Sequence, residues 1–186
     1  MQRSCIVEKY CYDNDENNCD EYGGLYQWDE MMEYTTTQGT QGICPVGWHL
    51  PSDGEWCTLT TYIDPTVDCG SNTWSGTDAG YKMKSTNGWY SNGNGSDAYG
   101  FSALPVGYCD SNGNFSRVEK STNFWSSTEN GTNAWNRNLN YNNDKVNRNN
   151  NNQENGFSVR CVKHWKQFIC TCRKILRQVF LKLWDS

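Results

Sequence analysis

Residues 135–142 read Trp-Asn-Arg-Asn-Leu-Asn-Tyr-Asn, so every second residue is an asparagine. A period of two is typical of a β-strand, because successive side chains point to opposite faces. The pattern therefore places Trp135, Arg137, Leu139 and Tyr141 on one face and asparagines on the other. A disordered polar tract has no such regular apolar positions, so we expect this segment to be folded.

A second strand of the same kind follows. Residues 143–145 are Asn-Asp-Lys, which are typical residues of a tight turn. Val146, Arg148 and Asn150 then continue the larger side chains, opposite Asn147 and its neighbours at 149 and 151. The sequence predicts a β-hairpin with an asparagine face.

The composition indicates one domain with a short appendage. The 186 residues include 9 Trp, 11 Tyr and 17 Gly, but few long aliphatic runs. Aromatic side chains bury large areas, so they stabilise a core even in a loop-rich chain. We predict an α+β fold with short antiparallel strands, and helix bundles and doubly wound folds fit poorly.

The charge is divided unevenly along the chain. Residues 163–186 hold six Lys or Arg and one Asp, a net charge of +5, which leaves −10 on residues 1–162. An acidic main domain argues against a nucleic-acid partner, because binding to phosphates needs clustered Lys and Arg.

Ten cysteines point to disulfides and an oxidising compartment, since few of them have metal-ligand spacing and only two histidines accompany them. We therefore expect an extracellular or cell-surface location and no metal. Residues 1–9 lack the apolar stretch of a signal peptide, so either an upstream export segment is missing from this sequence or the thiols stay reduced. We favour a truncated start.

Three further segments carry local predictions. Residues 1–22 are polar and are expected to form a loop closed by a disulfide between Cys11 and Cys19. Ser52 and Glu55 form a capping-box pattern, so a helix is predicted from about Asp53, with Trp56, Leu59 and Tyr62 inward. Residues 70–100 are rich in Gly, Ser and Asn and are predicted to be long loops.

The tail, residues 164–186, is predicted to be a basic amphipathic helix that is too short and too charged to span a bilayer. Such a helix either docks on its own domain or a partner, or contacts a membrane surface.

Several landmarks together resemble one family. They are YGGLYQW (22–28), CPVGWHLPSDGEW (44–56), GFSALPVGY (100–108), FWSSTE (124–129), AWNR (134–137) and GFSVRC (156–161). From about residue 10 to 163 the chain resembles the Fibrobacter succinogenes major paralogous domain. The resemblance implies a C-type-lectin-like fold of the formylglycine-generating-enzyme type over residues 23–163, found in bacterial surface proteins. Some members are variable proteins of diversity-generating retroelements.

In such elements, template adenines are copied with errors, and the affected codons encode Asn before mutation. The resemblance thus implies that the asparagine face is a diversifiable binding surface in a template-like state. Its scaffold would be Trp135, Arg137, Leu139, Val146, Arg148, Phe157 and Val159. The candidate ligand-binding residues are Asn136, Asn138, Asn140, Asn142, Asn143, Asn147, Asn149, Asn150, Asn151, Asn152 and Asn155.

The resemblance also implies a disulfide between Cys44 and Cys161, which would tie the first helix to the last strand. Spacing adds Cys57 with Cys69 to the pair of Cys11 and Cys19 already expected. The remaining four cysteines have no assigned partner, and sequence alone leaves all the connectivities open.

We expect no catalytic residue and no cofactor. Cys109 lacks the surrounding motif and the nearby base of a nucleophile, and His49 is more consistent with a structural hydrogen bond. The loop at Asp110, Asn112 and Asn114 has alternating oxygen ligands but lacks the sixth-position Gly and twelfth-position acid of a calcium loop, so a turn is predicted.

Three functions remain open at this stage. The favoured one is a binding module for a protein or glycan ligand on another cell or host surface. The second is a structural or adhesive surface repeat without diversification. The third is attachment to a membrane or a partner through the tail.

Overall fold

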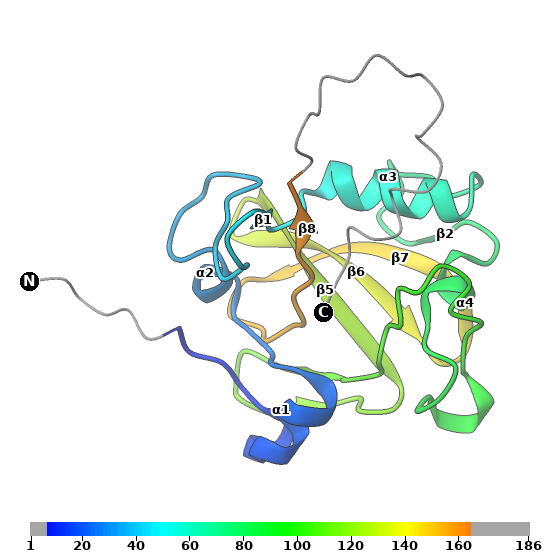
Figure 1. The fold of residues 1–186 in the computed structure, drawn as a ribbon, viewed down its shortest axis with the longest axis horizontal. Helices are drawn as coiled ribbons and strands as arrows, with labels where there is room; N and C mark the ends of the chain where they lie inside the picture. Colours follow the sequence, from blue (N-terminus) through cyan, green and yellow to red (C-terminus); the bar gives the residue numbers. More distant parts are fainter. Residues whose placement is uncertain (1–6, 165–186) are drawn as a thin grey trace, which may run out of the picture.

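The computed structural model describes residues 7–164, and the predicted tail helix lies outside the described residues from position 165 on. The described part is an α+β fold of short helices and antiparallel strands (Figure 1). The helical segments are η1 (Tyr12–Asn14), α1 (Glu16–Tyr22), α2 (Trp28–Met31), α3 (Asp53–Ile63), α4 (Ala79–Met83) and η2 (Tyr90–Asn92). The strands are β1 (Trp48–His49), β2 (Trp74–Ser75), β3 (Tyr108–Cys109), β4 (Phe115–Ser116), β5 (Ser121–Asn130), β6 (Asn133–Asn140), β7 (Asn143–Asn152) and β8 (Val162–Lys163).

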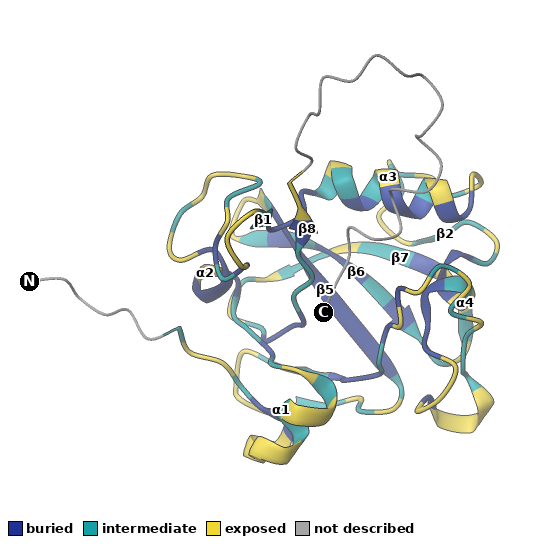
Figure 2. Cartoon of the chain, viewed as in Figure 1, coloured by how far each residue is buried: buried dark blue, intermediate teal, exposed yellow. Residues whose placement is uncertain are grey.

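A four-stranded antiparallel sheet with the order β2-β7-β6-β5 is the centre of the fold. Strands β5, β6 and β7 follow one another directly, and α3 crosses one side of the sheet while α4 packs beside β7 (Figure 1). β5 is buried along its first seven residues, as Figure 2 shows. The predicted hairpin therefore forms the two inner strands of the sheet, β6 and β7, between β5 and β2.

The hairpin turn lies two residues earlier than predicted. Residues 143–145 belong to β7, and the two-residue loop is Tyr141-Asn142, so that Asn140 pairs with Asn143. The turn predicted at residues 143–145 was wrong because a two-residue loop matches the twist of the hairpin strands. The turn-forming residue types that follow the loop belong to the strand. An irregularity in the pairing after Asn138 keeps both Leu139 and Val146 in the core.

Helix α3 begins as predicted, because the side chain of Ser52 accepts the N–H of Glu55 and the Glu55 carboxylate accepts the N–H of Ser52. Trp56, Leu59 and Ile63 are buried, but Tyr62 is 40% exposed. The Tyr62 ring makes an edge-to-face contact with the Tyr99 ring. The inward prediction for Tyr62 was wrong because positions three, four and seven after Trp56 share its face, whereas the sixth does not.

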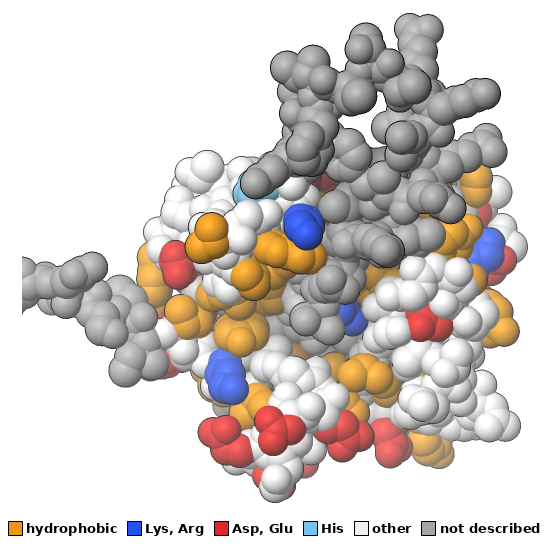
Figure 3. Space-filling view, viewed as in Figure 1, with side chains coloured by type: hydrophobic (Ala, Val, Ile, Leu, Met, Phe, Trp, Pro, Cys, Tyr) orange, Lys and Arg blue, Asp and Glu red, His pale blue; other side chains and the backbone are white. Residues whose placement is uncertain are grey.

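Two predicted loops contain helices. Residues 16–22, expected in a loop, form α1, whose first turn is capped by Asp15 through the N–H of Asn17. This helix has no apolar stripe, and its acidic side chains gather at one end of the domain (Figure 3). Within residues 70–100, α4 packs with Gly80 so close to the backbone of Lys145 that a Cβ would lie 2.2 Å from its carbonyl oxygen.

The core is aromatic, as the composition indicates. Trp28, Trp56 and Trp125 are essentially inaccessible to solvent. Each indole N–H donates to a backbone carbonyl, at 2.8, 3.1 and 2.9 Å respectively, so burial leaves none of these donors unpaired.

Disulfides join Cys11 to Cys19, Cys57 to Cys69 and Cys44 to Cys161. The last pair links positions 117 residues apart, close to where β1 pairs with β8, so the beginning and end of the central domain are tied together. Three disulfides indicate an oxidising, extracellular type of environment.

Candidate ligand-binding site

The two faces of the hairpin differ in chemistry because the pairing register keeps like residues together. Asn136 pairs with Asn149 and Asn138 with Asn147, whereas Arg137 pairs with Arg148. Directly opposed residues share a face of the sheet. We call these the asparagine face, which also carries Asn140 and Asn151, and the α3 face, which carries Trp135, Arg137, Leu139, Val146 and Arg148.

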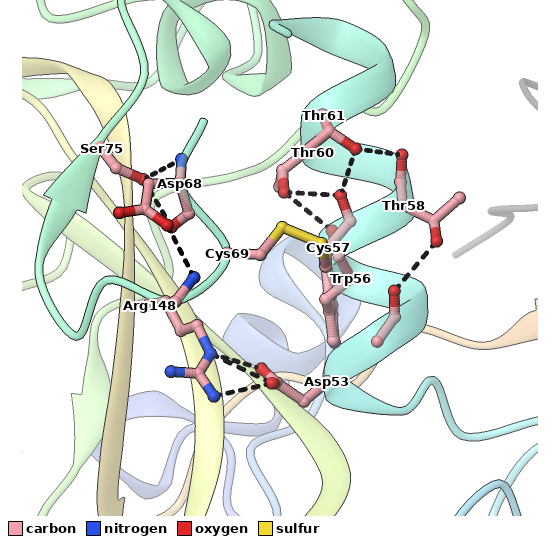
Figure 4. The surroundings of a disulfide bond; sticks show 12 residues. Asp53, Trp56, Cys57, Thr58, Thr60, Thr61, Asp68, Cys69, Ser75 and Arg148 are labelled. Atoms are coloured by element: carbon pink, nitrogen blue, oxygen red, sulfur yellow. Dashed lines mark hydrogen bonds and ion pairs between the residues drawn. A yellow bond between two sulfur atoms is a disulfide. The ribbon is translucent and has the colours of Figure 1, made fainter. Parts of the chain in front are cut away.

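The α3 face is held by one carboxylate. Asp53 at the start of α3 accepts from Arg137 Nη1 at 2.7 Å and from Arg148 Nη2 at 2.8 Å, and Arg148 Nε lies 3.0 Å from both carboxylate oxygens. Figure 4 shows the Arg148 contact beside the Cys57–Cys69 disulfide. The indole of Trp135 stacks against the Arg148 guanidinium at 3.4 Å. Hydrogen bonds thus fix the position of the hairpin relative to α3.

Electrostatics strengthen this junction. Burial raises the pKa of the Asp53 carboxyl, but hydrogen bonds and charge from Arg148 and Arg137 outweigh it, so the pKa lies below its ordinary value. Arg137 is 2% exposed, so its charge depends on Asp53 for compensation.

A buried lysine fixes the turn end of the hairpin. Lys84 is 1% exposed, and its Nζ donates to the carbonyls of Asn140 at 3.2 Å and Asn143 at 3.3 Å, the residues on either side of the two-residue loop. Burial lowers the pKa of this amine, while the nearby Asp144 carboxylate acts in the opposite sense. The buried Lys84 amine therefore holds both ends of the turn through hydrogen bonds.

The asparagine face forms the floor of a hollow of about 500 Å³. This volume lies within the range of small-molecule sites, roughly 300–1,000 Å³. Six of the predicted asparagines line it, together with Asn123 and Ser121; the six are Asn138, Asn140, Asn147, Asn149, Asn151 and Asn155.

The walls of the hollow are residues that the sequence did not indicate as binding residues. Trp74 of β2 stands opposite Asn147 in the register, on the same face. Tyr108 and Phe157 line the hollow as well, in an edge-to-face contact at 6.1 Å. Trp74 is a large aromatic residue within a Gly/Ser/Asn-rich stretch, a sequence signal that it shares with Trp89 and Tyr90.

Asp110 and Arg117 supply the two charges of the lining. Asp110 Oδ1 accepts the N–H of Asn112 at 2.8 Å and the N–H of Asn114 at 2.9 Å. Hydrogen bonds from Asn114 are the main cause of the lowered pKa of the Asp110 carboxyl. The carboxylate therefore holds the predicted turn between β3 and β4. Among residues 7–164, no group of three His, Cys, Asp or Glu side chains is placed to hold a metal ion.

Five of the predicted residues lie outside this hollow. Asn136 is on the asparagine face but is 0% exposed, so a ligand cannot reach it there. Asn150 pairs with Trp135 and Asn152 with Asn133, on the other side of the strand, and Asn133 Nδ2 donates to Asn150 Oδ1 at 2.8 Å. Of the other two, Asn142 lies in the two-residue loop, and Asn143 is the first residue of β7, opposite Asn140.

Burial of Asn136 has a long-range cause. Trp125 of β5 lies directly opposite it and packs on Phe157 at 4.3 Å. Phe157 belongs to a cluster with Trp28 and Ala134, which covers the adjoining part of the asparagine face. Only the remainder of that face is open to solvent.

Side-chain amides give the open floor both hydrogen-bond donors and acceptors. Asn138 Nδ2 donates to Asn123 Oδ1 and to the carbonyl of Thr122, both at 3.0 Å. Asn147 Oδ1 is buried and has no hydrogen-bond partner among the described residues. The arrangement can therefore bind a ligand that offers donors and acceptors together.

The comparisons with known proteins identify the family. Residues 4–163 match the family described as the Fibrobacter succinogenes major domain, and the chain belongs to it. Comparisons with curated proteins and with solved structures returned no match. In the part of the chain that the structure describes, no helix has the length and apolar character needed to cross a membrane.

Proposed function

We propose that this chain is an extracellular ligand-binding domain whose open asparagine face is a surface for diversification. The observation that carries the proposal is the separation of roles between the two faces of one hairpin. Residues of the α3 face hold the fold through Asp53 and the core, whereas the alternating asparagines line an open hollow.

Such a separation permits exchange without loss of the fold. Substitutions at accessible surface positions usually change the free energy of unfolding by about 0.5 kcal/mol or less, whereas core changes cost several times more. The proposed variable set is Asn138, Asn140, Asn147, Asn149 and Asn151, to which Asn155 adds a position beyond the strands.

We propose retroelement mutagenesis as the source of variation. Codons AAC and AAT encode Asn, and errors at their adenines yield Tyr, Ser, Asp, His, Gly and other residues. The density of asparagine then reflects a template-like state. Gene sequence tests this cheaply, because absence of these codons and of a near-copy repeat would exclude the mechanism.

The fold is proposed to be C-type-lectin-like. Support comes from the Cys44–Cys161 disulfide and the β1–β8 pair, which tie the region before α3 to the last strand, and from the loop-rich chain around a small antiparallel sheet.

A non-catalytic role is part of the proposal. Cys109 is 2% exposed, and burial together with the nearby Asp110 carboxylate raises the pKa of its thiol. A nucleophilic cysteine needs the reverse, a stabilised thiolate that substrate can reach. This thiol is therefore a packing group.

The ligand is a protein or a glycan on another cell or a host surface. In the all-asparagine state the floor lacks the Tyr, Trp and Arg side chains that dominate protein–protein contacts, so protein affinity should be weak. The test compares the full chain with an Asn138→Tyr/Asn147→Tyr/Asn149→Tyr variant against a panel of purified surface proteins.

The matched control carries Asn→Tyr changes at Asn87 and Asn112, which are exposed and outside the hollow. Protein ligands gained by the triple variant alone would support the proposal. Tight, selective protein binding by the unchanged chain, or equal gains in the control, would contradict it.

A further inference from the structure

We infer that the hollow, as it stands in this sequence, recognises an uncharged, hydroxyl-rich ligand, namely a short neutral saccharide. The inference rests on the proposed function, since it names the ligand class of the same site. It follows from three properties of the lining: amide density, aromatic walls and charge balance.

The floor favours hydroxyl groups over apolar groups. Asn138, Asn147, Asn149 and Asn151 present amides side by side on neighbouring strands. An apolar side chain resting on them would strip water from donors and acceptors without replacing its hydrogen bonds, which is unfavourable. A sugar hydroxyl both donates and accepts, so it matches either end of an amide.

The walls suit the other surface of a sugar. Pyranose rings carry C–H groups on their faces, and these pack well against an aromatic ring, whose face is electron-rich. Trp74 borders the floor on the β2 side, level with Asn147, and Tyr108 lines the hollow from β3. A ring held by the amides would therefore have an aromatic group within the same hollow.

Charge does not favour an ionic ligand. The lining holds one carboxylate, Asp110, and one guanidinium, Arg117, so its net charge is zero. Asp110 is already occupied with the turn that it holds. A phosphate or a strongly basic peptide would find no surplus of opposite charge, whereas a neutral saccharide needs none.

Geometry argues against an extended peptide bound by its backbone. Such peptides add a strand to a free sheet edge. Here the hollow lies over the face of the sheet, and β2 pairs with β7 at Trp74 and Ser75 along part of that edge. The contacts on offer come from side chains that stand on the sheet.

The test uses the full chain on an array of neutral oligosaccharides, including gluco-, manno-, galacto- and xylo-oligosaccharides, followed by calorimetric titration of the hits. We expect binding to at least one neutral class. Trp74→Ala should weaken that binding about tenfold, the order expected for loss of one aromatic contact. Asn149→Leu, which removes one floor amide at an exposed position, should weaken it as well.

Tyr81→Ala is the matched control, because Tyr81 is 42% exposed and does not line the hollow. Binding should be unchanged in that variant. Circular dichroism and thermal unfolding establish that each variant is folded, and Asn149→Leu keeps the test decisive if Trp74→Ala does not fold.

The inference is overturned if no neutral saccharide binds, or if hits bind equally well to folded Trp74→Ala and Asn149→Leu. Failure on the array together with new protein ligands for the tyrosine triple variant would reject the saccharide and leave the proposed function standing. Saccharide binding without any gain of protein ligands by the triple variant would support the saccharide and reject the proposed diversification.

Discussion

Asn136 provides the sharpest prediction about stability. It is 0% exposed, and neither its Nδ2 nor its Oδ1 has a hydrogen-bond partner among the described residues. A buried polar group without a partner costs about 1–3 kcal/mol of stability. The residue lies opposite Trp125, at the margin of the cluster that contains Phe157, where an apolar side chain is suited to the surroundings.

Replacing Asn136 with leucine keeps the branching at Cγ and removes both unpaired atoms, although the leucine side chain is larger. We expect Asn136→Leu to raise the free energy of unfolding by about 1–3 kcal/mol, less than two full penalties because the branched side chain must repack. For a domain of this size the midpoint temperature should rise by roughly 2–10 °C. Asn149→Leu is the control, since Asn149 is its exposed partner across the strand pair and should change stability by about 0.5 kcal/mol or less.

Urea unfolding of the full chain with intact disulfides, followed by tryptophan fluorescence, measures both variants. Equal slopes with denaturant concentration are required, so that a shifted midpoint reports stability. A decrease in stability for Asn136→Leu, or the same change in both variants, would refute the reasoning and show that the buried amide is needed.

Three further predictions concern the scaffold. Asp53→Ala leaves the buried guanidinium of Arg137 without compensation and should lower the free energy of unfolding by about 3–5 kcal/mol in urea titrations; a loss below about 1 kcal/mol would contradict the clamp. Burial raises the pKa values of Asp53 and Asp64, but hydrogen bonds to both, and the arginine charges at Asp53, lower them overall. The resulting stabilisation is present above about pH 4 and is lost as pH falls through the folded-state pKa values, so a midpoint that stays constant from pH 6 to 2 would be inconsistent. Removing the Cys44–Cys161 bridge with paired serines should cost about 2–5 kcal/mol in the same assay, and an unchanged midpoint would show that the bridge is dispensable.

Local features were predictable from sequence because their causes lie within a few residues. The capping box at Ser52 and Glu55 and the alternation from Trp135 to Leu139 each depend on near neighbours. Helix α1 was missed because its polar and acidic side chains show no apolar repeat, which is the pattern that predicts a helix from sequence. The two-residue turn was misplaced because several adjacent residues have turn-forming types.

The candidate site needed the structure because its parts are distant in sequence. Alternation alone predicts that Asn136 and Asn138 lie on the same face and are equally accessible. In the structure Trp125 and Phe157 pack over Asn136, whereas Asn138 lines the open hollow. Trp74 comes to the floor only through the pairing of β2 with β7. No spacing rule connects these segments, so the extent and the walls of the hollow follow from tertiary packing.

The most direct measurement compares two displayed libraries for resistance to protease. One randomises Asn138, Asn140, Asn147, Asn149 and Asn151 of the asparagine face. The other randomises the five residues of the α3 face, which are Trp135, Arg137, Leu139, Val146 and Arg148. The proposal predicts that most members of the first library stay folded and few of the second do. Equal folded fractions in the two libraries would contradict the division of the hairpin into a scaffold face and a surface for diversification.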